Sequence, residues 1–347
     1  MTRREHLEVG LAVLLVGTSA ALHYGGVTPV LTFLAAAAAI AVLARLVGAA
    51  TDQLGGRIGS SAAGVAQSAL GNLPELFIAL FALHAGLVGV VQGALVGSVI
   101  ANGVLVLGIA FFVGGLRNGT QRFDSPRARM IATLMVLAAA ILSMPALAHA
   151  FHTPAGPHAR TLSFVCAGVL IVVFFVTLPT FLGGGEDDDS GRKARWPLAL
   201  TTGLLGGAGV AAAFASDWFV AALTPATHAM HMSQDFAGVV IVAIAGNAVE
   251  NVVGIQLAVE DRMDFAISVI INSALQVALF LTPLLVFVSL AFSTPLTLAF
   301  PTLLAIALVL TGGICAVVVY DGESNWQEGA ILVGLYVVIA SSFWWGT

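Results

Sequence analysis

The stretch GNLPELFIAL, residues 71–80, places a glutamate, Glu75, and a proline inside an otherwise apolar run. Residues 246–255 read GNAVENVVGI, so both stretches share the pattern Gly-Asn-x-x-Glu. We call the sequence separation of Glu75 and Glu250 the repeat offset (250 − 75). An ionisable residue in an apolar span is costly and is a functional candidate by default. A repeated one indicates an internal duplication built around a functional site.

The chain around these motifs has the composition of a membrane protein. Of its 347 residues, 59% are hydrophobic and 9% are charged, whereas soluble domains carry roughly 25% charged residues. Apolar stretches predict an all-α polytopic membrane protein of about eleven transmembrane helices, the first of them no removable signal peptide. They are centred near residues 15, 38, 72, 100, 138, 171, 209, 247, 278, 308 and 337. The formal charge of −5 argues against nucleic acid as a partner.

The basic residues orient the predicted helices. With eleven spans, twelve of the thirteen lysines and arginines fall on one side of the membrane: Arg3, Arg4, Arg45, Arg57, Arg117, Arg122, Arg127, Arg129, Arg192, Lys193, Arg195 and Arg262. Only Arg160 falls on the other side. Because positive residues favour the cytoplasmic side, the N-terminus is expected in the cytoplasm and the C-terminus outside. The expected location is a bacterial inner (plasma) membrane.

The duplication extends beyond the two glutamates. Ser98 follows Glu75 at the same interval at which Ser273 follows Glu250 (98 − 75 = 273 − 250). The predicted organisation is a leading helix (1–25), a first five-helix repeat (26–182), an acidic cytoplasmic linker (183–196) and a second five-helix repeat (197–347). Because five is odd, the second repeat must cross the membrane in the opposite sense. Inverted repeats of this kind are typical of secondary transporters, which bind their substrates near the midplane.

Antiparallel repeats would bring Glu75 and Glu250 together. Two facing carboxylates cannot both stay ionised in a dry site, so they must bind protons or a cation. The expected neutral oxygen ligands are Asn72, Asn247, Ser98, Ser273 and Gln276. A ligand set made only of oxygens suits Ca²⁺. No cofactor is expected. Asn102 and Asn272 are either ligands or interhelical hydrogen bonders, and the sequence does not separate these roles.

The glycines and the proline of the two motifs predict how the site is built. Gly71 and Gly246 permit local unwinding, which would free backbone carbonyls as further ligands. Pro74 marks the position at which the first helix is interrupted.

These residues resemble the calcium/cation antiporter superfamily, and within it the calcium/proton exchangers (CAX-type). GNAVE (246–250) and NSALQ (272–276) are similar to the second-repeat motifs of that family, and GNLPE (71–75) with GSVIAN (97–102) to the first. The resemblance implies that the two glutamates carry Ca²⁺ and protons and that the five neutral residues support them. It also implies alternating access that exports cytosolic Ca²⁺ in exchange for H⁺.

Departures from that pattern leave alternatives. Leu73 and Pro74 are similar instead to the sodium/calcium exchanger branch, and Asn251 stands where the proton exchangers have histidine. A sodium-linked calcium exchanger or an Na⁺/H⁺ antiporter is therefore the second hypothesis. A membrane-embedded enzyme or a channel is a distant third. The glutamate motifs contain no histidine, cysteine or lysine, which favours a transporter over an enzyme.

Two further features have competing interpretations. The acidic run at 186–189 could bind regulatory Ca²⁺, although such runs are usually solvated linkers. Seven histidines map to the predicted outer side: His23, His84, His149, His152, His158, His228 and His231. They could bind metal or sense external pH, but outer connections also simply need polar residues. The sequence leaves the oligomeric state open.

Overall fold

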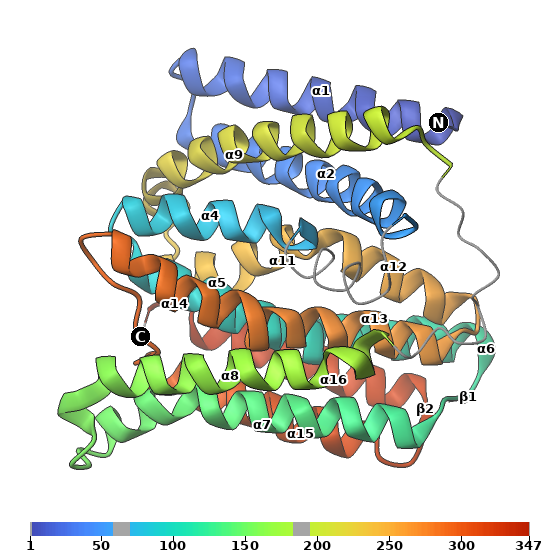
Figure 1. Ribbon diagram of the computed structural model, residues 1–347, viewed down its shortest axis with the longest axis vertical. Coiled ribbons are helices and arrows are strands. Elements are labelled where there is room, and N and C mark those ends of the chain that lie inside the picture. Colours follow the sequence, from blue (N-terminus) through green and yellow to red (C-terminus); the bar gives the residue numbers. More distant parts are fainter. Residues whose placement is uncertain (1, 58–69, 183–194, 347) are drawn as a thin grey trace.

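The computed structural model describes residues 2–57, 70–182 and 195–346 and is mostly helical within them. Figure 1 shows helices lying alongside one another, with the two chain termini at opposite ends of the bundle. The predicted all-α architecture is therefore confirmed. Of the predicted linker (183–196), residues 183–194 lie outside the described residues, and the acidic run falls among them.

The elements of the described chain follow in order. Up to residue 182 they are α1 (Arg3–Tyr24), α2 (Pro29–Gly55), α4 (Leu73–His84), α5 (Val88–Ile100), the π-helix η1 (Ala101–Val106), α6 (Leu107–Asn118), strand β1 (Gln121–Arg122), α7 (Ser125–Ala150), the 3-10 turn η2 (Gly156–His158) and α8 (Ala159–Leu182). After the linker come α9 (Leu198–Ala229), α10 (Gln234–Phe236), the π-helix η4 (Ala237–Val242), α11 (Ala243–Gly246), α12 (Ala248–Val259), α13 (Met263–Gln276), the π-helix η5 (Val277–Leu281), α14 (Thr282–Val288), the 3-10 turn η6 (Ser289–Ala291), α15 (Thr302–Val318), strand β2 (Glu323–Ser324) and α16 (Trp326–Ser342).

The helices recur at the repeat offset. Helix α12 begins at Ala248 and ends at Val259, and both positions lie one repeat offset after the ends of α4, Leu73 and His84. Helices α5 and α13 begin at the same separation. The duplication therefore extends from short motifs to the starts of two successive helices in each half. The boundaries of the two repeats remain predictions.

Seven helices in the described ranges are long and apolar enough to cross a membrane, or eight if the bent pair Gln234–Gly246 and Glu250–Val259 forms one span. Three shorter apolar helices, α4, α15 and α16, have 12, 17 and 17 residues. Because several expected spans are short or interrupted, the count of eleven remains a prediction.

The connections that carry Arg122 and Arg195 lie at the same end of the bundle as the N-terminus. We call this end the arginine face. Arg195, next to α9, lies 3.8 Å from Glu5 near the N-terminus. Strand β1 pairs antiparallel with β2, and Arg122 bonds Glu323 across that pair at 3.0 Å. Figure 1 places β1, β2 and the N-terminus at the same end. The predicted grouping of these connections on one side therefore agrees with the fold.

Near the centre of the molecule, α5 of the first half packs closely against η4 of the second. A Cβ atom added to Gly97 would overlap the carbonyl oxygen of Val239, so only glycine fits there without a backbone shift. Small residues commonly let helices approach closely in membranes. The two halves are therefore in backbone contact next to Ser98.

Gly97→Ala is expected to lower the melting temperature by several degrees, because overpacking a tight contact costs about 1–3 kcal/mol. Gly168→Ala is the matched control, since a Cβ added to that α8 glycine would meet nothing within 4 Å. The measurement is thermal unfolding of the two purified variants in detergent. Equal melting temperatures would contradict the close packing of α5 on η4.

Candidate cation site

The two glutamates occupy the same position in two interrupted helices. Helix α4 begins at Leu73 and α12 at Ala248, so each glutamate is the third residue of its helix. The preceding asparagines have almost identical backbone angles, φ −95° and ψ 20° at Asn72, and φ −94° and ψ 20° at Asn247. The chain bends by 64° between Gln234–Gly246 and Glu250–Val259.

This local geometry explains the proline. Pro74 lies in the first turn of α4, where its missing N–H would have no helical partner and its fixed φ suits the helix. The sequence-based expectation that Pro74 marks an interruption therefore agrees with the structure. The helix start also places Glu75 in the first turn of α4. Glu250 has the same position in α12.

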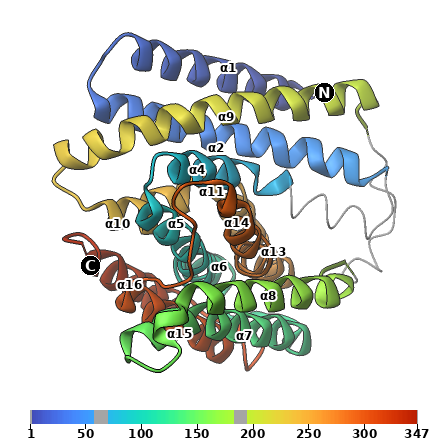
Figure 2. The same ribbon diagram turned by 60° about the vertical axis from the view of Figure 1, so that its left-hand side comes forward.

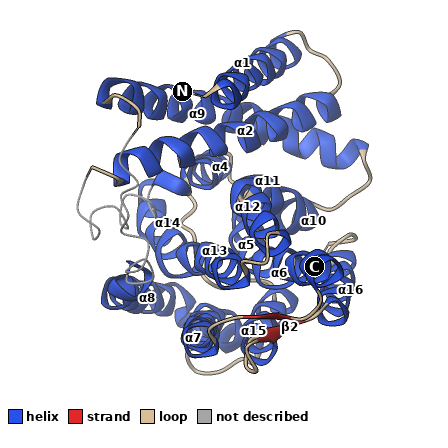
Figure 3. Cartoon of the chain, turned by 90° about the vertical axis from the view of Figure 1, so that its right-hand side faces the viewer, coloured by secondary structure: helices blue, strands red, loops and turns tan. Residues whose placement is uncertain are grey.

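The helices that carry the glutamates lie in the middle of the molecule. Figures 2 and 3 place α4, α11 and α12 between the layer of α1, α2 and α9 and the helices α7, α8, α15 and α16. Glu75 is 8% exposed, and its Oε2 atom has no hydrogen-bond partner among the described residues. Glu250 is partly buried and lies four residues after Gly246, whose backbone the Glu75 side chain contacts. The structure therefore brings the two predicted carboxylates together.

Gly246 has a different role from the one expected. It is the last residue of helix α11 rather than part of an unwound stretch. A Cβ atom there would lie 2.7 Å from Cγ and 2.9 Å from Cδ of Glu75, so the Glu75 side chain rests directly on the Gly246 backbone. Gly246 thus provides space for a carboxylate from the other half of the chain.

Asn247 lies at the centre of a buried polar cluster. Its Nδ2 donates to Oγ of Ser98 at 2.9 Å, and its Oδ1 accepts from Oγ of Ser273 at 3.1 Å. Ser98 belongs to α5 and Ser273 to α13, so this asparagine joins both repeats. Nearby, Nδ2 of Asn72 donates to Oε1 of Gln276 at 3.3 Å. All five predicted neutral residues therefore make side-chain bonds within the predicted set.

Asn102 belongs to this cluster as well. Its side chain is fully buried, and its Nδ2 donates to Asn247 at 3.2 Å and to Ser273 at 3.3 Å. Its Oδ1 has no hydrogen-bond partner in the described part of the chain. Asn272 instead bonds Ser268 one turn away on its own helix. The sequence offered one signal that Asn102 belongs to the cluster. It follows Ser98 by about one helical turn, which places both side chains on one helix face.

Wide helical turns follow the two serines. The π-helix η1 spans Ala101–Val106 and η5 spans Val277–Leu281, at nearly equivalent places in the two repeats. Such π segments occur frequently at functional sites, since they interrupt the regular α-helical bonding. The site thus lies where α4 and α12 are broken and α5 and α13 are widened.

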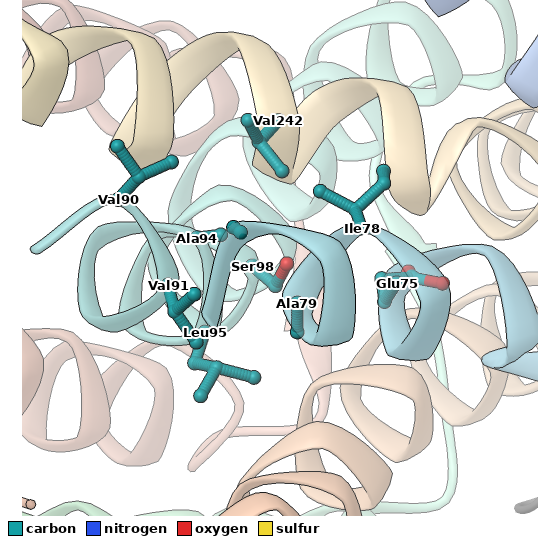
Figure 4. Close-up of a pocket in the computed structure, with 10 residues that line it drawn as sticks. Glu75, Ile78, Ala79, Val90, Val91, Ala94, Leu95, Ser98 and Val242 are labelled. Atoms are coloured by element: carbon teal, nitrogen blue, oxygen red, sulfur yellow. The ribbon is translucent and has the colours of Figure 1, made fainter. Parts of the chain in front are cut away.

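A cavity lies beside Glu75 (Figure 4). Its wall is formed by eight apolar side chains and by the polar side chains of Glu75 and Ser98. The apolar residues come from α4, α5 and η4, with Val91 and Leu95 on α5 among them. The buried carboxylate therefore borders a small, mostly apolar cavity.

The histidines of the described ranges form no comparable centre. His149, His152 and His158 lie at the connection between α7 and α8. Across the residues that the structure describes, no group of three histidine, cysteine or acidic side chains is placed to hold a metal ion. A regulatory role of the histidines stays a hypothesis.

The family model described as sodium/calcium exchanger protein matches residues 28–183 and 200–345. The chain therefore belongs to this family of membrane transporters, and the resemblance to cation antiporters is confirmed. It is 33% identical to a Ca²⁺/H⁺ antiporter of Synechocystis sp. over 94% of each chain. It is 32% identical to the Ca²⁺/H⁺ antiporter ChaA of Bacillus subtilis, over 88% of this chain and 89% of that one.

Solved structures show the same fold. The structure of native YfkE superposes with a TM-score of 0.83 and 32% identity, covering 97% of this chain and 99% of that one. The H⁺/Ca²⁺ exchanger CAX gives a TM-score of 0.75 at 16% identity, over 97% of this chain and 88% of that one. At that identity the likeness to CAX concerns the fold alone.

Proposed function

We propose that the protein is a secondary antiporter that exchanges cytosolic Ca²⁺ for H⁺ by alternating access. The observation that carries this proposal is the pair Glu75 and Glu250, each third in a helix that starts at a break and each close to buried amides and hydroxyls. The names of the Synechocystis and Bacillus relatives support Ca²⁺ and H⁺ as the exchanged ions.

The chemistry of the site explains why the two ions would compete. Two ionised carboxylates in a water-poor site repel each other, and either Ca²⁺ or protons relieve that repulsion. The proposed Ca²⁺ ligands are the two glutamates with oxygens of Asn72, Asn247, Ser98, Ser273 and Gln276. We assign Asn102 to holding Asn247 and Ser273 in place, because it bonds both. The unloaded, doubly ionised site would be too costly to dehydrate, which would prevent leak.

The proposed orientation follows from the arginine face. It is the cytoplasmic side of a plasma membrane, with the N-terminus there and the C-terminus outside. The two inverted halves (26–182 and 197–347) would then place their glutamates near the midplane, with the linker in the cytoplasm. Ca²⁺ would enter from the cytoplasm and leave on the opposite face.

A sodium-linked exchanger is the second candidate, favoured by Leu73 and Pro74 ahead of Glu75. Purified protein in liposomes separates the two. With an imposed pH gradient and no sodium, we expect ⁴⁵Ca²⁺ uptake. With an imposed Na⁺ gradient and no pH gradient, we expect uptake at the level of empty liposomes. The reverse pattern would replace H⁺ by Na⁺ as the coupling ion, and uptake in neither condition would contradict calcium exchange altogether.

A further inference from the structure

Residues 292–301 join η6 to α15 without helical structure. Alternate side chains along this segment are buried: Leu296 is 1% exposed, Leu298 is 0% and Phe300 is 4%. That period of two is typical of an extended chain with one face packed on protein. We call residues 292–301 the strap, because its second half packs on the bundle through Leu296, Leu298 and Phe300.

Two helices bind the backbone of the strap. Gln92 of α5 is a large amide that is only 7% exposed, and its Nε2 donates to the carbonyl oxygen of Thr297 at 2.8 Å. Ser163 of α8 accepts the N–H of Leu298 through its Oγ at 2.9 Å. A buried amide is costly unless its groups are hydrogen-bonded. The bond to the strap therefore satisfies the amide N–H donor of Gln92. These bonds link α5 to α8 through the strap.

The strap lies near the end of the cavity that is remote from Glu75. Val91, next to Gln92 on α5, lines that cavity. At the end of α4, the ring of His84 lies 6.5 Å from the ring of Phe292, edge to face. Figure 2 shows the connection from α14 passing α5 on its way to α15. The strap therefore covers the ends of the two helices that form most of the cavity wall.

The other half of the molecule has an equivalent connection on the arginine face. Residues 119–124 join α6 to α7 and fall within the stretch 117–126, which lies one repeat offset before the strap. Within them Gln121 donates to the carbonyl oxygen of Ala258 at 2.9 Å and to Oδ1 of Asp261 at 2.8 Å, at the end of α12. In both cases a buried glutamine of the first half, Gln92 or Gln121, donates to a backbone carbonyl of the second half.

We propose that the strap closes the cavity beside Glu75 on the face opposite the arginine face, and that Gln92 is the positioning residue that holds it closed. This rests on the proposed exchange function, since an alternating-access transporter must keep one face shut while the other is open. Release of the two strap contacts would open the cavity to that face. Opening should therefore become easier when Gln92 loses its donor.

Thiol accessibility tests this closure without any transport. The background is Cys166→Ser with Cys315→Ser, and the reporter is Val91→Cys, whose native side chain is 1% exposed in the cavity wall. A membrane-impermeant thiol reagent is added from one face at a time to sealed vesicles. Exposed reporters, Thr120→Cys next to β1 and His152→Cys beyond α7, establish which face the reagent reaches.

Adding Gln92→Leu should raise labelling of Val91→Cys from the strap face about tenfold, the factor expected for losing one ordinary hydrogen bond. Gln121→Leu is the matched control at the opposite end and should leave that rate unchanged. If Gln92→Leu does not fold, Ser163→Ala loosens the same strap from α8 and should also raise the rate. An unchanged labelling rate of Val91→Cys in a folded Gln92→Leu or Ser163→Ala protein would overturn the closure.

Failure of this proposal and failure of the exchange function are distinguishable. Labelling of Val91→Cys depends only on access, whereas the function depends on the two glutamates. If exchange is normal and the strap variants do not change the labelling of Val91→Cys, the exchange function stands and the proposed closure is wrong.

Discussion

Glu75→Gln is expected to abolish Ca²⁺ uptake driven by a pH gradient, and Glu250→Gln is expected to do the same. Glutamine keeps the size of the side chain but carries no charge and cannot take up or release a proton. Removing one member of a buried set of charges typically costs about 3–5 kcal/mol, which is a loss of a hundredfold or more in affinity. The measurement is ⁴⁵Ca²⁺ uptake into liposomes that contain each purified variant.

The matched control is Glu260→Gln, at the exposed end of the same helix as Glu250. It removes one carboxylate without touching the site, so uptake should stay at the level of the unmodified protein. Elution volume and thermal unfolding show whether the inactive variants remain folded. Normal uptake by folded Glu75→Gln and Glu250→Gln proteins would remove both residues from the proposed mechanism.

The motifs predicted much of the site because their spacing carries three-dimensional information. The repeat offset between Glu75 and Glu250 implied two equivalent helix starts, and the structure has them. The equal steps from the glutamates to Ser98 and Ser273 extended the duplication and predicted both serines as ligands beside the glutamates. Both serines indeed bond Asn247. The repeated motifs therefore predicted which residues of the two halves are equivalent, and a single copy of the motif could not have done so.

Two hydrogen-bonding residues that join the halves, Asn102 and Gln92, could not be assigned their partners from the sequence. Asn102 has a valine at its equivalent position, 277, so repetition gave no signal for its bonds to Asn247 and Ser273. The bond from Gln92 to the strap joins residues far apart in the sequence without any motif. Gly246 looked like a point of unwinding because glycine has that property in general. Its actual contact is with a side chain from the other half.

That contact leads to the second strong prediction. Gly246→Ala is expected to impair exchange at least tenfold while the protein stays folded, the loss that accompanies about 1.4 kcal/mol of binding free energy. The new Cβ would lie 2.7 Å from Cγ of Glu75, which is closer than such atoms approach, so this side chain must move. A glutamate side chain shifts more easily than backbone, and alanine is favourable in a helix. The effect should therefore fall on the carboxylate rather than on stability.

Gly313→Ala is the matched control, because a Cβ added to that α15 glycine would meet nothing within 4 Å. The apparent Ca²⁺ affinity and the melting temperature are measured for both variants. Weakened Ca²⁺ affinity with an unchanged melting temperature in Gly246→Ala alone is the expected result. An unchanged affinity would mean that the position of the Glu75 carboxyl does not matter for the cation. The expected loss would instead imply that the close fit of one half on the other sets the carboxylate geometry, so that a movement between the halves would directly alter the affinity of the site.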